Sequence, residues 1–322
     1  MKTIAVFTSG GDSPGMNACI RAVVRTAAYY GIKVKGIIGG YQGMIENEFV
    51  DLDIKSVANI IQRGGTILKT ARSKDFLTLE GRQKALQNLK NQGIEGIVAI
   101  GGDGTFKGAL EFSKISDIPV VGCPGTIDND LAGTDFTIGY DTAINTVIEA
   151  VDKLRDTAES HNRVFVVEVM GRDAGLIALR SGIASGAEEI FIPETRSDLD
   201  NLIEKLSKGR KDKSSKIIMV AEGDEAGGAF QVSKVIKEKL PDLDVRVSIL
   251  GHIQRGGSPT CMERVNASRM GFAAVEAIKE GKNMVMIGVV NMNIAYTPFE
   301  KAVKHIEAPH PDLLRMMDIL SM

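Results

Sequence analysis

The sequence has little cysteine and no long apolar run. Its 322 residues include three cysteines, none spaced as C-x-x-C, which argues against a structural zinc site and for a reducing cytosol. No stretch approaches the roughly 20 apolar residues of a membrane span. The apolar run in "MKTIAVFTSGG" is too short for a signal peptide. We therefore expect a cytoplasmic protein that does not enter a membrane.

A surplus of charge of one sign is also absent. The formal net charge is −2 at pH 7, so no overall field attracts nucleic acid or a membrane surface. The sequence has no low-complexity linker and no convincing repeat. Because the chain has 322 residues, 43% of them hydrophobic, it can bury a large core, and its length favours two lobes over one.

Short β-branched runs alternate with helical stretches along the chain. The predicted strands are residues 3–8, 33–38, 95–100, 118–123, 163–169, 216–221, 245–250 and 286–290. The predicted helices are residues 15–30, 80–91, 105–113, 139–158, 174–185, 197–207 and 262–279. This alternation indicates βαβ units, and so predicts an α/β protein with mainly parallel sheets covered by helices on both faces.

Glycine beside an acidic or basic residue follows six of the predicted strands. The six segments are "SGGDSPG" (9–15), "GGDGT" (101–105), "PGTIDND" (124–130), "MGRD" (170–173), "EGDE" (222–225) and "GHIQRGG" (251–257). In open α/β sheets, ligands bind outside the carboxyl ends of the strands. One such segment is an ordinary turn, but six of them predict two ligand-lined crevices.

Two of these segments suit a phosphate group. Gly10 and Gly11 precede a predicted helix whose free N–H groups attract anions, although tight strand-to-helix packing explains the glycines equally well. "GGDGT" adds the carboxylate of Asp103, which is either an N-cap or a ligand to Mg²⁺ held together with substrate phosphates. Thr105 can cap the helix under either interpretation.

"PGTIDND" places Asp128 and Asp130 two residues apart, directly after an apolar strand. An Asx-rich turn explains this composition. If Asp103 and Asp130 instead face one Mg²⁺–nucleotide, Asp128 is left to act as a general base in phosphoryl transfer. Arg72 and Arg172 are then available for the developing charge, although each alone is typical of a protein surface.

Further cations suggest more anion sites. Four of them lie at the starts or ends of predicted strands: Arg163, Arg246, His252 and Arg255. A phosphomonoester would account for these four, and solvation of strand edges is the alternative for the arginines. Arg21 and Arg25 share one helix face, where they bind an anion or are solvated. The basic run "KGRKDKSSK" (208–216) is typical of a solvated loop.

Five segments in this order match one family. "TSGGDSPGMNA", "GGDGT", "PGTIDND", "VEVMGR" and "LGHIQRGGSP" together resemble the bacterial 6-phosphofructokinases, from residue 1 to about residue 290. "GGDGT" alone is less specific, because NAD kinases and diacylglycerol kinases carry a similar block. The resemblance implies two Rossmann-like lobes in a homotetramer. It implies transfer of the γ-phosphoryl group of ATP, with Mg²⁺, to the 1-hydroxyl of fructose 6-phosphate, which gives fructose 1,6-bisphosphate and ADP in glycolysis.

The resemblance also implies a role for each matching position. The residues implied in catalysis are Asp128 as the proton acceptor, Thr126, Arg72 and Arg172. The residues implied in ATP binding are Gly11, Arg72, Ser73, Gly102, Asp103, Gly104 and Thr105, and those implied in Mg²⁺ binding are Asp103 and Asp130. The residues implied in sugar phosphate binding are Thr126, Ile127, Asp128, Arg163, Met170, Gly171, Arg172, Glu222, Arg246, His252, Ile253, Gln254 and Arg255. Of these, Arg163 and Arg246 would serve the site of a neighbouring subunit.

An effector site is implied as well. Its residues would be Arg21, Arg25, Arg155, Gly186, Ala187, Glu188, Lys211 and Lys213. ADP or GDP would activate there and phosphoenolpyruvate would inhibit. Related enzymes commonly read Gly-Lys-Lys where this chain has Asp212-Lys213-Ser214, so the affinity and the sign of regulation stay open.

The implied lobes are discontinuous, with an ATP lobe of residues 1–138 and 251–305 and a fructose 6-phosphate lobe of residues 139–250 and 306–322. One alternative is a pyrophosphate-dependent phosphofructokinase. Those enzymes place Asp where this chain has Gly104 and Lys where it has Gly125, so glycine at both positions favours ATP by leaving room for its α-phosphate. The other alternative is a non-catalytic sensor of nucleotide or sugar phosphate, which would not need the base Asp128.

Overall fold

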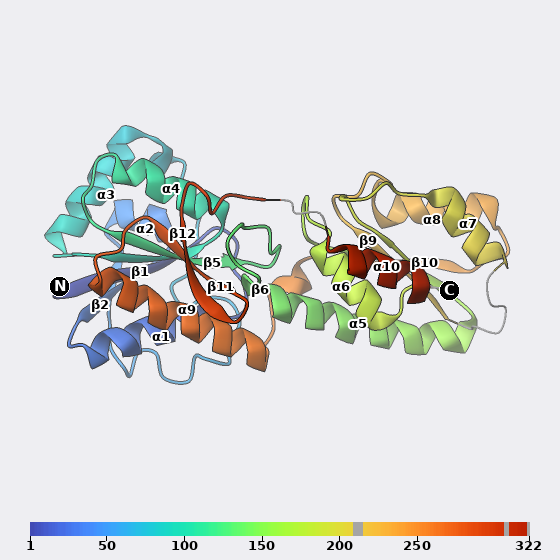
Figure 1. Cartoon of the computed structure of the whole chain (residues 1–322), viewed down its shortest axis with the longest axis horizontal. Helices are drawn as coiled ribbons and strands as arrows, with labels where there is room; N and C mark the ends of the chain where they lie inside the picture. Colours follow the sequence, from blue (N-terminus) through green and yellow to red (C-terminus); the bar gives the residue numbers. More distant parts are fainter. Residues whose placement is uncertain (209–214, 306–308, 321–322) are drawn as a thin grey trace. The chain divides into compact units, whose positions relative to one another are not determined.

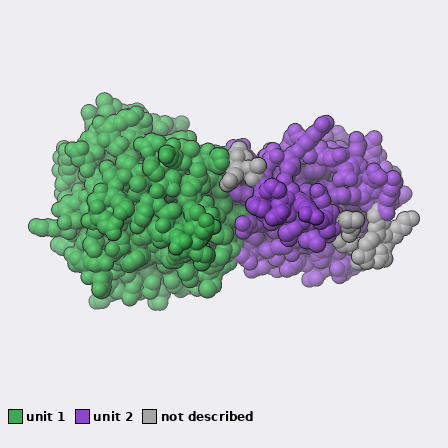
Figure 2. All heavy atoms as spheres, viewed as in Figure 1, with its two compact units in different colours: residues 1–142, 255–305 green, residues 143–254, 306–322 purple. Residues whose placement is uncertain are grey.

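The computed structural model describes residues 1–208, 215–305 and 309–320. The chain divides into two compact units, coloured separately in Figure 2: unit 1 is Met1–Thr142 with Arg255–His305, and unit 2 is Ala143–Gln254 with Ile306–Met322. The chain leaves unit 1 within helix α5 (Tyr140–His161) and returns within the 3-10 helix η2 (Gly251–Arg255). Among the described residues, no helix is long and apolar enough to cross a membrane.

Unit 1 is built on an eight-stranded, mainly parallel sheet in the order β12-β11-β5-β4-β1-β2-β3, with β6 paired to the end of β5 (Figure 1). Its strands are β1 (Thr3–Ser9), β2 (Lys33–Ile37), β3 (Phe49–Leu52), β4 (Ile97–Gly101), β5 (Val120–Thr126), β6 (Ile138–Gly139), β11 (Val285–Val290) and β12 (Asn293–Pro298). The pairs β2–β3 and β11–β12 are antiparallel and form the two edges.

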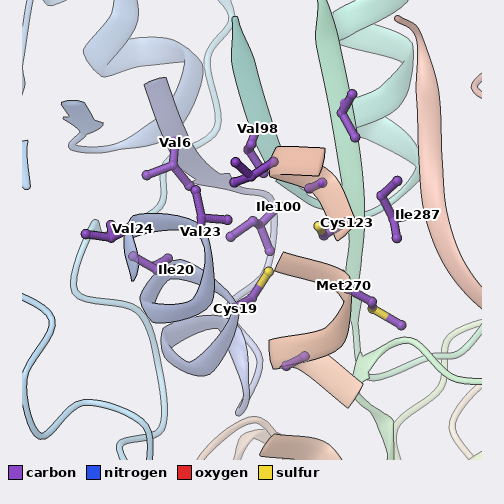
Figure 3. Packing of buried hydrophobic residues seen from close by; sticks show 14 of the residues in the cluster. Val6, Cys19, Ile20, Val23, Val24, Val98, Ile100, Cys123, Met270 and Ile287 are labelled. Atoms are coloured by element: carbon purple, nitrogen blue, oxygen red, sulfur yellow. The ribbon is translucent and has the colours of Figure 1, made fainter. Parts of the chain in front are cut away.

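Successive residues of the central strands point to opposite faces of this sheet. On β1, Ile4 and Val6 belong to one buried cluster, which Figure 3 shows in part, while Ala5 and Phe7 belong to another. The first cluster includes residues of α1 (Met16–Tyr29) and α9 (Cys261–Lys279), and the second includes residues of η1 (Asp75–Leu77), α2 (Gly40–Glu46), α3 (Leu79–Asn91) and α4 (Asp103–Ser113). Burial on both faces is why these strands read as continuous apolar runs.

Unit 2 has a four-stranded parallel sheet in the order β10-β7-β9-β8. Its strands are β7 (Val164–Val169), β8 (Glu189–Phe191), β9 (Lys216–Ala221) and β10 (Val245–Ile249), and its helices after α5 are α6 (Leu176–Ser185), α7 (Leu199–Lys208), α8 (Gly228–Lys239) and α10 (Pro311–Leu320). Leu202 of α7 and Val232 of α8 join Ile218 of β9 in one buried cluster. On the other face, α6 lies so close that a Cβ at Gly182 would be 2.5 Å from Ile190 Cδ1.

The predicted fold class is therefore confirmed: both sheets are mainly parallel and carry helices on both faces. Every predicted strand and helix is present, with ends shifted by a few residues. The prediction missed α2, α8, α10 and the short or edge strands β3, β6, β8 and β12. The β11–β12 hairpin was hidden because Asn291 and Met292, rather than an Asn-Gly pair, take the positive φ angles of 48° and 65° that its turn needs.

Candidate active site

The strand order of unit 1 reverses at β1, since β2 and β3 lie on one side and β4 and β5 on the other. Ligands bind at such a switch point, outside the carboxyl ends of the strands. β1 and β4 end in register there, since Ser9 pairs with Gly101, and Gly101 pairs with Pro124 near the end of β5. The segments that follow them, residues 9–15, 101–105 and 124–130, therefore start at one edge of the sheet.

The first segment leads from β1 to helix α1. Gly10 takes a positive φ of 87°, and Thr70 Oγ1 donates to its carbonyl at 2.7 Å. A Cβ at Gly11 would lie 2.2 Å from Arg255 Nη1, so a larger residue there would displace the end of the Arg255 side chain. Arg255 also donates to the Asp12 carbonyl at 3.4 Å. Arg255, predicted to contact the sugar phosphate, is thus placed in unit 1 against the glycine loop.

In the second segment, helix α4 begins at Asp103, and Gly102 is the N-cap. The expectation that Thr105 or Asp103 caps the helix is therefore wrong; Asp103 instead lies in the first turn, where the helix dipole favours a carboxylate. Thr105 is buried, and its hydroxyl contacts the Ser9 carbonyl at 3.4 Å while its own carbonyl accepts from Tyr41 Oη at 2.6 Å. A Cβ at Gly104 would have nothing within 4 Å, so the loop leaves open space beside that residue.

The third segment answers whether "PGTIDND" is a turn or a site, because it contains both. Asn129 makes the turn: its φ is 53°, and its side chain accepts from Thr137 N at 2.7 Å and donates to the Asp135 carbonyl at 3.1 Å. The carboxylates on either side, Asp128 and Asp130, are 3% and 7% exposed. Asp128 N donates to Thr126 Oγ1 at 3.2 Å. The turn thus holds two buried carboxylates at the strand end.

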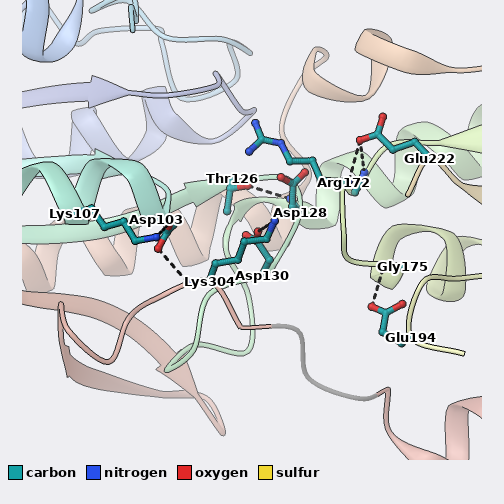
Figure 4. A network of polar contacts seen from close by, with 11 residues as sticks. Asp103, Lys107, Thr126, Asp128, Asp130, Arg172, Gly175, Glu194, Glu222 and Lys304 are labelled. Carbon is teal, nitrogen blue, oxygen red and sulfur yellow. Dashed lines mark hydrogen bonds and ion pairs between the residues drawn. The ribbon is translucent and has the colours of Figure 1, made fainter. Parts of the chain in front are cut away.

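Two lysines, Lys107 and Lys304, contact the carboxylates of Asp103 and Asp130 (Figure 4). Lys107 Nζ lies 2.6 Å from Asp103 Oδ2. Lys304 donates its backbone N–H to Asp103 Oδ1 at 3.1 Å, and its Nζ lies 3.8 Å from Asp130 Oδ2. Lys304 therefore contacts both carboxylates that were predicted to serve Mg²⁺.

Whether these carboxylates suit Mg²⁺ depends on the other ligands of the ion, such as water and substrate phosphates. In the described part of the chain, no group of three or more His, Cys, Asp or Glu residues could hold a metal. Mg²⁺ usually keeps several waters and binds through one or two carboxylates and the phosphates of a substrate. Asp103 and Asp130 fit an ion of that kind.

The other predicted ATP residues of unit 1 lie between β3 and α3. Arg72 is exposed in this loop. Ser73 is tied into the protein, since its hydroxyl donates to Gln42 Oε1 at 2.6 Å and accepts from Phe76 N at 3.1 Å. Ile127, predicted to contact substrate, is fully buried and serves the core.

In unit 2, the loop "MGR" after β7 is held by two side chains. Glu222 Oε1 accepts from Arg172 N at 2.8 Å (Figure 4) and from Gly171 N at 3.4 Å. Gln254, fully buried, accepts from Met170 N at 3.2 Å. Gly171 and Arg172 both have positive φ angles, 147° and 54°, which is an unusual backbone conformation. The hydrogen bonds to Glu222 and Gln254 hold the loop in it. His252 and Ile253 are exposed.

Arg163 and Arg246 share one carboxylate, that of Asp244. Arg163 Nε donates to Asp244 Oδ2 at 2.7 Å, and Arg246 Nε lies 2.9 Å from Oδ1. The hydrogen bond from Arg163 and then that from Arg246 hold the pKa of Asp244 below its usual value. The two arginines thus form one cationic group on the edge strand β10 and the start of β7.

The predicted effector residues fall in both units. Arg21 is half-buried and Arg25 exposed on α1, in unit 1. In unit 2, Arg155 donates to the carbonyls of Ser185 and, at 3.5 Å, Gly186, so it caps the carboxyl end of α6. Ala187 is buried, and Glu188 N donates to the Ile217 carbonyl at 2.8 Å. Lys211, Lys213 and Ser214 lie outside the described residues.

Comparison with known proteins decides the family. The family model described as phosphofructokinase matches residues 3–278. The chain belongs to the phosphofructokinase family. The protein named ATP-dependent 6-phosphofructokinase 2 of Bacteroides thetaiotaomicron is 54% identical, over 100% of this chain and 99% of its own length. ATP-dependent 6-phosphofructokinase 1 of Thermus thermophilus is 56% identical, over 100% of both chains.

Solved phosphofructokinases share the fold. The T-state structure from Pichia pastoris has a TM-score of 0.87 and 36% identity over 99% of this chain. This chain spans only 37% of that longer protein. A pyrophosphate-dependent phosphofructokinase from Marinobacter aquaeolei has a TM-score of 0.84 but 22% identity, so that likeness concerns the fold alone.

Sequence reasoning on this phosphofructokinase missed three residues that hold site residues in place. Asp244 precedes Arg246 by two positions, a spacing that puts both side chains on one side of a strand, so the pair was detectable. Tyr41 and Lys304 gave no local signal, because the residues they contact are far away in the sequence.

Proposed function

We propose that this chain is an ATP-dependent 6-phosphofructokinase, which transfers the γ-phosphoryl group of ATP to the 1-hydroxyl of fructose 6-phosphate and releases fructose 1,6-bisphosphate and ADP. Support comes from relatives of that name at 54% and 56% identity over the whole chain. The structural observation that carries the proposal is the buried carboxylate of Asp128, which follows β5. The glycine segments after β1 and β4 start at the same edge of the sheet.

The proposed roles follow from chemistry. Asp128 accepts the proton of the 1-hydroxyl as that oxygen attacks, which general base catalysis requires. Arg72 and Arg172 stabilise the charge that develops on the transferred group. Mg²⁺, when bound with ATP, would be held by Asp103 and Asp130 and would neutralise phosphate charge. The open space at Gly104 leaves room for the nucleotide near the first turn of α4.

The acceptor side is assigned to unit 2. The arginine pair on Asp244, Arg163 and Arg246, supplies cations for the 6-phosphate bound in the site of a neighbouring subunit. The division into an ATP lobe of residues 1–138 and 251–305 and a sugar phosphate lobe of residues 139–250 and 306–322 remains part of the proposal. The cytoplasmic location also remains a prediction, made from cysteine usage.

A coupled assay tests this function. Purified protein with Mg²⁺, ATP and fructose 6-phosphate should form ADP and fructose 1,6-bisphosphate, and pyrophosphate in place of ATP should support less than a tenth of that rate. Higher turnover with pyrophosphate would favour the pyrophosphate-dependent alternative. No turnover with either donor, in protein that binds ATP, would favour the non-catalytic sensor.

Gly104→Asp tests the donor assignment most cleanly. Because a Cβ at Gly104 has nothing within 4 Å, the protein should fold normally, whereas a Cβ at Gly125 would lie 2.8 Å from Met16 Cε and 3.3 Å from Gly101 N. We expect the KM for ATP to rise at least about tenfold, through crowding and through repulsion of the phosphates. Gly104→Asn, of equal size but neutral, should show the crowding alone. An unchanged KM for ATP in both variants would show that Gly104 does not select the donor.

We also propose the homotetramer and the effector site that the resemblance implies, with ADP or GDP as activators and phosphoenolpyruvate as inhibitor. Light scattering at assay concentration measures the mass of the assembly, and a monomer of full activity would refute the tetramer.

Saturation curves with and without ADP or phosphoenolpyruvate, for the parent and Arg25→Ala, test the effector site. Half-saturation points that do not move in the parent would refute it.

A further inference from the structure

Lys304 lies on a tail segment that returns to the acidic loop after β5. Lys304 forms an isolated antiparallel bridge with Leu131. On either side of it, His305 N donates to the Asp130 carbonyl at 2.8 Å, and Ala132 N donates to the Val303 carbonyl at 3.3 Å. Backbone pairing therefore fixes Lys304 beside Asp130, whatever its side chain does.

The contacts of Lys304 join a carboxylate in the first turn of α4 to one in the loop after β5. Its backbone N–H donates to Asp103 Oδ1 at 3.1 Å, and its Nζ lies 3.8 Å from Asp130 Oδ2. The Lys304 side chain is 29% exposed and that of Asp130 8%, so solvent screens this pair only in part. Lys107 Nζ lies 2.6 Å from Asp103 Oδ2, but its side chain is 62% exposed, so solvent screens that pair more strongly.

A lysine at this place has two opposite effects on a divalent cation. The ammonium group, 3.8 Å from Asp130 Oδ2, stabilises that carboxylate, whereas the contact with Asp103 is made by the uncharged backbone N–H. The same ammonium group raises the electrostatic cost of bringing a second cation to those oxygens. Lys304 therefore sets how strongly the carboxylates attract a metal that is not accompanied by phosphates.

We propose that Lys304 is a positioning residue, whose ammonium group orients the Asp130 carboxylate and competes with a divalent metal ion for it. Because of this competition, a free ion binds poorly, and an ion that brings nucleotide phosphates is favoured. The proposal rests on the proposed function, in which these two carboxylates serve the metal of Mg²⁺–ATP.

Binding of Mn²⁺ alone to the nucleotide-free protein tests the competition, with free Mn²⁺ measured by its electron spin resonance signal. Lys304→Met should bind Mn²⁺ about tenfold more tightly than the parent, since a positive charge near the ion is lost. Lys304→Arg keeps the charge and should stay close to the parent. Lys301→Met is the matched control, because Lys301 is exposed on the same segment and its loss changes the net charge equally.

Equal or weaker Mn²⁺ binding by Lys304→Met would overturn the proposal, as would no measurable binding by either the parent or this variant. An equal gain in Lys301→Met would overturn it too, because the effect would then be one of net charge. If Lys304→Met does not fold, Lys304→Gln takes its place, since the backbone pairing with Leu131 needs no lysine side chain.

Two further measurements separate this proposal from the proposed function. Asp103→Asn and Asp130→Asn should each weaken Mn²⁺ binding in the Lys304→Met background, and no weakening would refute the carboxylates as metal ligands. The coupled assay on the parent reports the function independently. If Lys304→Met gains Mn²⁺ affinity but the parent does not phosphorylate fructose 6-phosphate, the competition stands and the proposed function fails. The opposite pair of results refutes the competition alone.

Discussion

The two units balance their clustered charges in opposite ways. In unit 1, the carboxylates of Asp103 and Asp130 face two lysines, so these four groups together carry no net charge. In unit 2, two arginines share the single carboxylate of Asp244, so that group keeps one positive charge. In the first cluster a lysine competes with an added cation, whereas the second can take an anion without losing a partner. The difference suits a metal–nucleotide in unit 1 and a phosphomonoester in unit 2.

Asp128→Asn should have the largest effect, because it removes the carboxylate proposed to accept the proton. The carboxylates proposed to hold the metal, Asp103 and Asp130, stay in place. We expect kcat to fall by about 10²–10⁴-fold, the usual contribution of a general base, with the KM for fructose 6-phosphate little changed. Steady-state kinetics measure both. Asp130→Asn is the control from the same turn, and its defect should instead depend on Mg²⁺ concentration. A kcat for Asp128→Asn within about threefold of the parent would end the assignment of Asp128.

Another buried carboxylate, Glu263, sharpens the comparison because its hydrogen-bond donors are neutral groups. Its Oε2 accepts from Thr142 N and from the Thr142 hydroxyl, both at 3.3 Å. These contacts lie where the chain leaves unit 1. Burial raises the pKa of Glu263 to about 7, against the lowering effect of backbone hydrogen bonds from Gly139 and Thr142.

Glu263 should therefore make the protein less stable as the pH rises. In the unfolded chain its pKa returns to an ordinary value near 4.5, so between pH 4.5 and 7 the folded state holds a proton that the unfolded state has lost. Its stabilising contribution is complete below pH 4.5 and disappears by about pH 7, a change of about 3 kcal/mol. Relative to the parent, Glu263→Gln should gain thermal stability between pH 5 and pH 8, measured as Tm by circular dichroism.

The exposed carboxylate of Glu300 supplies a control for this experiment. Glu300→Gln should keep a constant Tm difference from the parent over the same pH range. A constant difference for Glu263→Gln as well would show that Glu263 is ionised in the folded state at pH 5. The burial argument would then be wrong.

Much of unit 1 was predictable because its central strands are buried on both faces and read as apolar runs ended by glycine and acid. The position of Asp128 and Asp130 at such an end followed from this pattern. The pairing of Asp130 with Lys304 did not, since it depends on a backbone bridge between residues 131 and 304. The local secondary-structure propensity of each segment does not reveal a contact between residues so far apart in the sequence.

Local reasoning also misjudged where one helix begins. Thr105 suits a helix cap by residue type, but α4 starts two residues earlier, at Asp103, with Gly102 as its N-cap. Arg155 was implied in effector binding by the family resemblance, and that role stays a prediction. In the structure it caps α6, a role that sequence could not reveal without knowing where that helix ends relative to α5.

The smallest effect is expected for Asp244→Asn, which breaks the cationic group of unit 2. Charge alone predicts tighter binding of the sugar phosphate, since a negative charge beside Arg163 and Arg246 is removed. Positioning predicts the reverse, because Asp244 contacts both guanidinium groups, at 2.7 Å and 2.9 Å, and Asn is a weaker acceptor. We expect positioning to prevail and the KM for fructose 6-phosphate to rise about threefold with kcat nearly constant. Because its pKa is lowered, Asp244 is ionised at neutral pH, so the defect should be the same at pH 7 and pH 8. Tighter binding at low salt that vanishes at high salt would show instead that Asp244 acts by charge and that the arginines need no partner to stay in place.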